Sequence, residues 1–194
     1  ANLFTYNANW FGSDTASLRV FEDGGNLAFK ANDLKTHIDL AMREGIFHSN
    51  GSDSYVELPA NQYISYIDKL KWKMDEESLT LGDEIARGEG SRFVTIHPDQ
   101  DSLSFFAKTA FYSLKDYIIH ANGVENIAVA DAIISPNSGI VTVAKKAVIE
   151  TLYGARILAD DLTQHHTFTN ATVNIKSAHN YTASGDYTYK DAMN

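Results

Sequence analysis

Apolar residues between Asp101 and Ala121 recur at a spacing that is typical of an α-helix with two apolar sides. One stripe follows successive helical turns and consists of Leu103, Ala107, Ala110, Leu114, Tyr117 and Ile118. A second stripe, spaced by seven residues, consists of Phe105, Tyr112 and Ile119. A helix that is apolar on both sides is buried on both, or it presents one side to another chain. The first alternative predicts a central helix inside its own domain. The second predicts that Phe105, Tyr112 and Ile119 form an interface between chains.

Three further stretches carry apolar stripes at helical spacing. They begin at Asn32, at Asn61 and near Gly139. Their stripes are Leu34, Ile38, Ala41 and Met42, then Tyr63, Ile67, Leu70 and Met74, and finally Ile140, Ala144, Ala147 and Thr151, with Leu158 added if the last helix continues that far. Gly154 can end the last helix early and leave Ala155 to Ala159 as a strand, so the pattern leaves this boundary open. The sequence predicts three to four helices in all.

Strands are predicted between and before these helices. Ser54 to Leu58 alternates apolar and polar residues, and Arg92 to His97 has the composition of a strand. Val124 to Ile134 is rich in Ile, Val and Ala, which favours a buried strand. Near the N-terminus, Asp23-Gly24-Gly25 separates two short strand-like runs and indicates a tight turn in a hairpin over Ser17 to Lys30.

The chain changes character in its last segment. His166 to Lys176 and Tyr181 to Lys190 are rich in Thr, Asn and Tyr, alternate loosely and are predicted to join at Ala183 to Asp186. The predicted architecture is therefore α+β, with a mixed sheet, an N-terminal hairpin and a C-terminal β hairpin or arm. Residues 1–162 form the predicted core domain, and residues 163–194 form the hairpin or arm as part of the same domain.

The composition is that of one ordinary globular domain, with 194 residues of which 44% are hydrophobic and 21% charged. The longest apolar run, Ile127 to Ile134, contains Asp131 and is far shorter than the roughly 18 to 20 residues that span a membrane, which predicts a soluble chain without a membrane partner. The lack of cysteine excludes disulfides, thiolate zinc sites and cysteine nucleophiles, but it leaves the compartment open. Ala1 is compatible with removal of an initiator methionine and with cleavage of a leader, so the sequence assigns no localisation.

The net charge of -9 disfavours general binding to nucleic acid, because a negative field repels phosphate groups. The most basic cluster, Lys69 to Lys73, places Trp72 between lysines, which could stack a base. Asp75, Glu76 and Glu77 follow directly, and they favour a solvated helix face instead.

His97, Asp99 and Asp101 follow a predicted strand and combine an imidazole with two carboxylates. With Asp131 from the other predicted strand, they could bind a divalent metal and support a metal-assisted hydrolase. The structural alternative is that Pro98 turns the chain, Asp101 caps the next helix and Asp99 is solvated.

A second candidate metal pair is Asp161 and His165, which share a face at a spacing of four if the segment is helical. Ordinary surface histidines are the alternative. Gly88 to Arg92 resembles part of a phosphate loop but lacks its lysine, which favours a turn. No other catalytic motif is present, and the sequence predicts no cofactor.

A helix ending at Asn122-Gly123-Val124, a buried strand, and a helix start at Ser135-Pro136-Asn137-Ser138 follow one another up to Lys146. This order resembles the apical region of tailed-phage major capsid proteins. The resemblance implies that the hairpin over Ser17 to Lys30 is the extended loop, that the helix from Asn61 is the spine, and that Ala1 results from maturation cleavage. It implies no catalytic residues.

Two classes of function follow from these patterns. The first is a non-enzymatic structural subunit that self-assembles into a homo-oligomer through Phe105, Tyr112 and Ile119. The resemblance implies a capsid-type shell and a location in the virion. The alternative is the metal-assisted hydrolase built on His97 and its neighbouring carboxylates.

Overall fold

The computed structural model describes residues 4–83, 88–159 and 166–189, and in these ranges the protein is all-β. Its regular structure consists of strands and one short 3-10 turn, and no α-helix forms among the described residues. None of them belongs to a helix that is long and apolar enough to cross a membrane. The expected α+β class with three to four helices is therefore wrong.

The strands follow one another along the chain with mostly short connections. The first nine are β1 (Phe4–Tyr6), β2 (Trp10–Phe21), β3 (Leu27–Asp39), β4 (Glu44–Ser49), β5 (Tyr55–Leu58), β6 (Tyr63–Tyr66), β7 (Lys69–Lys73), β8 (Ser78–Gly82) and β9 (Ser91–Thr95). After them come the 3-10 turn η1 (Pro98–Gln100), β10 (Ser104–Ala107), β11 (Thr109–Ser113), β12 (Ile118–Asn122), β13 (Ile127–Val129), β14 (Ala132–Ser135), β15 (Ile140–Val143), β16 (Leu152–Ala159), β17 (His166–Ser177) and β18 (Asn180–Tyr189).

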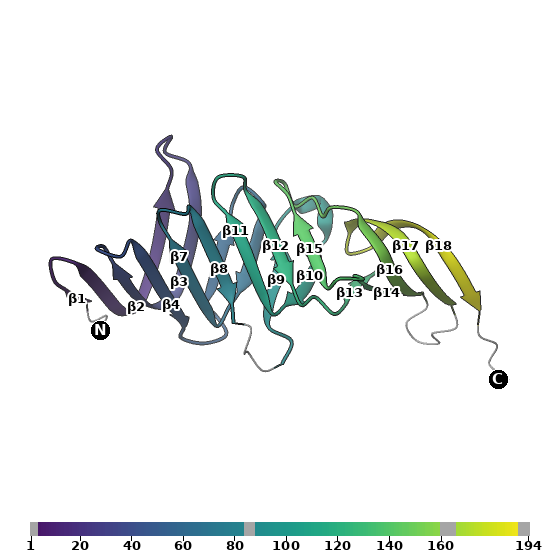
Figure 1. Cartoon of the computed structure of the whole chain (residues 1–194), viewed down its shortest axis with the longest axis horizontal. Helices are drawn as coiled ribbons and strands as arrows, with labels where there is room; N and C mark the ends of the chain where they lie inside the picture. Colours follow the sequence, from purple (N-terminus) through teal and green to yellow (C-terminus); the bar gives the residue numbers. More distant parts are fainter. Residues whose placement is uncertain (1–3, 84–87, 160–165, 190–194) are drawn as a thin grey trace.

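β3 organises the larger sheet because it pairs along both edges and changes partner on one of them. β2 pairs with one edge of β3. On the other edge, Leu34 to Asp39 pairs with β4, whereas Lys30 to Asn32 pairs with β5. From this fork, a first layer runs β4-β7-β8-β11-β12-β15, and a second layer runs β5-β6-β9-β10. The two layers contribute to one hydrophobic core, as in a sheet that folds back on itself (Figure 1).

Successive hairpins lie in alternate layers. The β5–β6 hairpin belongs to the second layer, β7–β8 to the first, β9–β10 to the second and β11–β12 to the first. The steps between layers can be very short, since Lys108 alone connects β10 to β11. Each hairpin therefore extends the molecule in one direction. Figure 1 shows the resulting elongated shape, with β1 and β18 at opposite ends.

A second sheet, in the order β13-β14-β16-β17-β18, completes the fold. β13 lies beside β10, so this sheet prolongs the second layer. The predicted C-terminal hairpin is present as β17 and β18, but its turn lies at Ala178-His179 and not at Ala183 to Asp186. The predicted N-terminal hairpin is also present, as β2 and β3 with the turn around Asp23 to Gly25.

The seven-residue spacing over Asp101 to Ala121 comes from three short strands and not from a helix. The residues that face the core are Phe105 and Ala107 in β10, Ala110 and Tyr112 in β11, Leu114 and Tyr117 in the turn, and Ile119 and Ala121 in β12. Side chains alternate within each strand, and the phase slips by one residue at each connection, as at Lys108. Core positions are therefore two or three residues apart and repeat every seven residues, which resembles a helical stripe.

The other predicted helices are strands for the same reason. Residues 32–45 lie in β3, β4 and their turn, the stretch from Asn61 contains β6 and β7, and the stretch from Gly139 contains β15. Ile67 and Leu70, for example, lie on the two sides of a step between layers, and both are buried. Their spacing of three residues reflects the slip in phase at that step.

The strand predictions are more successful. Those over Ser54 to Leu58 and Arg92 to His97 are confirmed in their main part by β5 and β9, and Ala155 to Ala159 lies within β16. Val124 to Ile134, expected as a single buried strand, is instead the β13–β14 hairpin with its turn at Ala130-Asp131. The apolar composition is the same in both cases, so it did not reveal the turn.

The change of partner along β3 occurs at Asp33, whose backbone is left-handed with a φ of 53°. The loop between β4 and β5 holds this corner. Ser54 Oγ donates to the Asp33 carbonyl at 2.6 Å, and Asn50 Nδ2 donates to the Asp14 carbonyl in β2 at 2.9 Å. The loop thereby ties both bent strands together.

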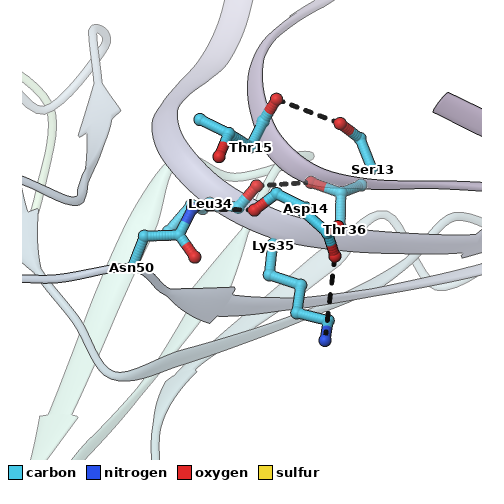
Figure 2. A network of polar contacts seen from close by, with 7 residues as sticks. All are labelled: Ser13, Asp14, Thr15, Leu34, Lys35, Thr36 and Asn50. Carbon is cyan, nitrogen blue, oxygen red and sulfur yellow. Dashed lines mark hydrogen bonds and ion pairs between the residues drawn. The ribbon is translucent and has the colours of Figure 1, made fainter. Parts of the chain in front are cut away.

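Figure 2 shows how β2 and β3 satisfy their own backbone at this bend. Ser13 Oγ donates to the Thr15 carbonyl at 3.0 Å, and Thr36 Oγ1 donates to the Leu34 carbonyl at 3.2 Å. The register between β2 and β3 shifts at this point, which removes regular ladder bonds. Short polar side chains next to the bend replace those bonds.

Two glycines surround the single-residue step at Lys108. A Cβ atom added to Gly82 would lie 2.4 Å from the Lys108 carbonyl oxygen, and one added to Gly90 would lie 2.3 Å from the Ala107 carbonyl oxygen. Both glycines also have positive φ values, 82° and 86°. The step between the layers therefore depends on the absence of side chains at both positions.

We expect Gly90→Ala to lower the free energy of unfolding by at least about 2 kcal/mol, because it adds a backbone clash to the roughly 1–2 kcal/mol cost of a left-handed backbone. Gly24→Ala is the control, since the nearest atom to an added Cβ there is 3.7 Å away. Urea unfolding followed by circular dichroism measures both. Equal stability of the two variants would contradict the crowding at Lys108.

Candidate functional site

The predicted metal residues His97, Asp99 and Asp101 form a tight structural turn. His97 Nδ1 accepts a hydrogen bond from the Asp99 backbone N–H at 3.1 Å, which caps η1. The Asp99 side chain is exposed, and Asp101 ends η1 in the left-handed conformation. The expectation that Asp101 caps a following helix is wrong, because β10 follows.

Asp131 lies in the turn between β13 and β14, where its charge affects Tyr181 of β18. Burial, and to a smaller extent the charge of Asp131, raises the pKa of the Tyr181 phenol. Among the described residues, no group of three or more His, Asp or Glu is arranged to hold a metal ion. The structure therefore does not bring His97, Asp99, Asp101 and Asp131 together as a metal site. The second candidate pair, Asp161 and His165, lies outside the described residues.

Gln100, which sequence reasoning passed over, makes the long-range contacts of this segment. Its side chain is buried, and its Nε2 donates to the Ala147 carbonyl at 2.6 Å. Its own carbonyl accepts a hydrogen bond from the Ala178 N–H at 3.1 Å. Gln100 thus joins η1 to the β15–β16 connection and to the β17–β18 turn. A lone glutamine within an acidic turn carries no sequence signal for this role.

The predicted interface residues Phe105, Tyr112 and Ile119 lie in the core of a single chain, with exposed fractions of 2%, 0% and 0%. The Phe105 ring stacks on Phe93 at 5.4 Å between centroids. Tyr112 and Ile119 are direct partners across β11 and β12, and burial raises the pKa of the Tyr112 phenol. The alternative that these residues are buried within their own domain is therefore correct, but they lie on strands of two facing layers and not on a helix. They cannot form the proposed contact between chains.

The segments behind the capsid resemblance fold as strands. The residues before Asn122, expected as the end of a helix, form strand β12. The region from Ala128 to Lys146 contains the end of β13 and all of β14 and β15. Ser135 to Ser138 leads through a turn into β15, and the expected spine helix from Asn61 is β6 and β7. The helices on which the resemblance depends are therefore absent from this part of the chain.

The basic cluster lies on β7, where every lysine has an acidic partner. The pairs are Lys69 with Asp83 at 3.7 Å, Lys71 with Glu44 at 2.9 Å and Lys73 with Glu76 at 2.7 Å. Trp72 points to the other face of the strand and contacts the Phe29 ring in the core. The cluster is thus a paired surface of a sheet, and the expected solvated helix face is wrong because the segment is a strand.

A groove of about 580 Å³ lies between the tip of the β2–β3 hairpin and the turns after β7 and β11. Glu22 at the hairpin tip accepts a hydrogen bond from the Tyr117 hydroxyl, and this bond raises the pKa of Tyr117. No serine, threonine or histidine is among the described residues that line the groove. Its polar groups hold the hairpin tip against the first layer and do not form a nucleophile–base pair.

The most distinctive surface is the outer edge of β18, at one end of the molecule (Figure 1). Among the described residues, β18 pairs only with β17, so its other edge carries free backbone N–H and C=O groups. The pairing contains two irregularities, near Asn170 and Lys176, and in both the extra residue belongs to β17. β18 itself is therefore regular over its ten residues.

One face of β18 prolongs the hydrophobic core, but no strand in the described part of the chain lies over most of it. Directly opposed residues share a face in an antiparallel pair. The opposed pairs are Ile175 with Tyr181, Val173 with Ala183 and Phe168 with Tyr187. We call Tyr181, Ala183, Gly185 and Tyr187 the core-facing row of β18. Tyr181 is half-buried, the rest of the row is exposed, and Tyr187 is 53% exposed.

Side-chain contacts fix the end of β18 onto β17. The Tyr187 hydroxyl lies 2.8 Å from His166 Nδ1, and the Tyr187 ring lies 5.1 Å from the Phe168 ring. On the opposite face, Asn170 Nδ2 donates to Asp186 at 2.9 Å. The edge is thus held in an extended form without a partner strand.

The other end of the molecule has a related surface on β2. β1 pairs with Phe11 to Ser13, and among the described residues no strand pairs with the outer edge of Ala16 to Phe21. Leu18 and Val20 oppose core residues of β3 and pack against the core, although both remain partly exposed. Both ends of the molecule therefore present an open strand edge beside an incompletely covered core.

We expect Tyr112→Glu to unfold the chain or to destabilise it by at least about 4 kcal/mol, because an unpaired carboxylate would enter the core. Phe111→Glu is the matched control, because the neighbouring Phe111 is 43% exposed on the outer face of β11. Urea unfolding of both variants beside native mass provides the measurement. A folded Tyr112→Glu variant with a reduced native mass would restore the interface hypothesis.

Comparison of this chain with protein-family models, with curated proteins and with solved structures finds no match.

Proposed function

We propose that this chain is a non-enzymatic structural subunit that self-assembles by continuing its β-sheet from one copy to the next. The observation that carries the proposal is the open edge of β18, which is regular and lies beside an uncovered core-facing row. The proposed contact thus replaces the predicted interface of Phe105, Tyr112 and Ile119. Assembly depends on the ends of the molecule and not on its buried centre.

The composition of β18 supports this proposal. Edge strands in monomeric proteins are usually protected by lysine, proline, bulges or a covering segment. Between Asn180 and Tyr189 there is no lysine or proline, and the only charged residue is Asp186. Asp186 points away from the core-facing row, toward Asn170. A partner strand can therefore approach this edge without meeting a buried charge.

The energies indicate which part of the contact matters most. Each backbone hydrogen bond gained at the edge contributes about 0.5–1.5 kcal/mol, whereas association costs about 4–15 kcal/mol. A short strand pairing alone therefore gives weak association. Burial of the core-facing row adds roughly 25 cal/mol for each Å² of apolar surface, and the rings of Tyr181 and Tyr187 supply much of that surface.

The polar clusters of the described chain support a structural function. His97 caps η1, Gln100 joins three connections, and Tyr117 holds the hairpin tip through Glu22. These three side chains hold segments of the fold in place. No observation in the structure favours the alternative of a metal-assisted hydrolase, so it is not proposed further.

We expect Ala183→Lys to abolish assembly, because it places an ammonium group in the core-facing row that a partner would bury. Ala183 is exposed in the single chain, so the variant keeps the fold. Ser184→Lys is the matched control, with the same charge on the opposite face of β18. Native mass over a range of concentrations, in multiples of 21.5 kDa, measures assembly.

The expected order of assembly is wild type, then Ser184→Lys, with Ala183→Lys remaining a monomer. A wild-type chain that stays monomeric at the highest attainable concentration contradicts the proposed function. Unchanged assembly of Ala183→Lys shows that β18 is not the contact. Circular dichroism of each variant confirms that only association has changed.

A further inference from the structure

We infer that the edge of β18 pairs with the segment Ala16 to Phe21 of β2 in a second copy, so that copies join head to tail. This inference rests on the proposed self-assembly and names the surface that receives β18. β18 lies at one end of the long axis, and β2 lies toward the other end, next to β1 (Figure 1). Because the two surfaces are separate and no described strand pairs with either edge, one copy can contact two different neighbours.

The receiving segment has the backbone form that strand pairing requires. β1 covers β2 only as far as Ser13, which leaves the outer edge of Ala16 to Phe21 open among the described residues. The register shifts between β2 and β3 beyond Ala16 place the extra residues in β3. The segment is thus a regular six-residue edge, which is long enough for an added strand.

The apolar faces of the two edges also correspond. Leu18 and Val20 oppose Ala31 and Phe29, which are buried in the core, so their side chains lie on the core face of β2. They pack against the core only in part. If the core-facing row of β18 lies beside them, the core of one copy continues into the core of the next, and both incompletely covered rows become buried.

The charges of the two edges are complementary. Arg19 lies between Leu18 and Val20 on the outer face of β2, and no ion pair joins it to another described residue. Asp186 is the only charge on β18 and also lies on the outer face, since it alternates with Tyr187. A continued sheet has both charges on one face. A symmetric pairing of two β18 edges has only two negative charges there.

The proposed contact joins two different surfaces, β18 of one copy and β2 of the next. Such a contact adds copies one after another into an open filament, unless the rotation between neighbouring copies closes the series into a ring. The inference therefore predicts an open series of copies that lengthens with concentration. A symmetric pairing of two β18 edges stops at a dimer instead.

Mixing two blocked variants tests this arrangement. Ala183→Lys blocks the β18 edge and leaves β2 intact, whereas Val20→Lys blocks the β2 edge and leaves β18 intact. We expect each variant to be monomeric alone and the mixture to form a one-to-one dimer, measured by native mass. If Val20→Lys alone assembles like the wild type, the head-to-tail inference is overturned while the proposed self-assembly stands. A monomeric wild type overturns both.

A peptide of residues 14–22 provides a second measurement that does not depend on the folding of Val20→Lys. We expect the labelled peptide to bind the wild-type chain and to bind Ala183→Lys at least about tenfold more weakly, in fluorescence anisotropy. A scrambled peptide is the control. Tighter binding of a peptide of residues 180–188, or equal binding to the wild type and Ala183→Lys, would overturn the inference.

Discussion

The fold depends on one constraint, which is that the chain passes between two facing layers in very few residues. At Lys108 a single residue makes this passage. Backbone atoms of Ala107 and Lys108 occupy the space that a Cβ atom at position 82 or 90 would need, so both positions are glycine. The same short steps place consecutive hairpins in alternate layers. Each hairpin then covers the one before it, and a single core runs along the molecule.

This way of building a core also explains why the ends differ from the middle. In the middle, most strands pair along both edges and two layers share the core, although β10, β13 and β15 each pair with a single strand. Toward the ends, the outer edge of β18 pairs with no described strand, and the outer edge of β2 is paired only in part, by β1. The proposed function follows from this difference, because strand edges and core faces without partners are the surfaces that gain most from a second copy.

Polar residues act in this fold as joints between segments that are far apart in the chain. Asn61, in the turn between β5 and β6, donates through Nδ2 to the carbonyls of Tyr117 and Val143, at 2.7 and 3.1 Å. These bonds connect the second layer to the first at the rim of the core. Gln100 has a corresponding role near the β17–β18 turn. Neither residue stands out in the sequence, whereas the bonds of the more conspicuous His97 and Asp99 stay within their own turn, between Thr95 and Gln100.

The sequence by itself determined the hairpins at both ends, the strands β5 and β9, and the apolar character of Phe105, Tyr112 and Ile119. It could not determine the fold class, because short strands with a slip of phase at each step repeat every seven residues, as a helical stripe does. Only the tertiary structure decided that these three side chains are buried inside one chain, and that His97, Asp99, Asp101 and Asp131 do not form a metal-binding group among the described residues. It also decided which strand edges are open, because an edge is open only when no other segment lies beside it, and that depends on contacts between distant parts of the chain.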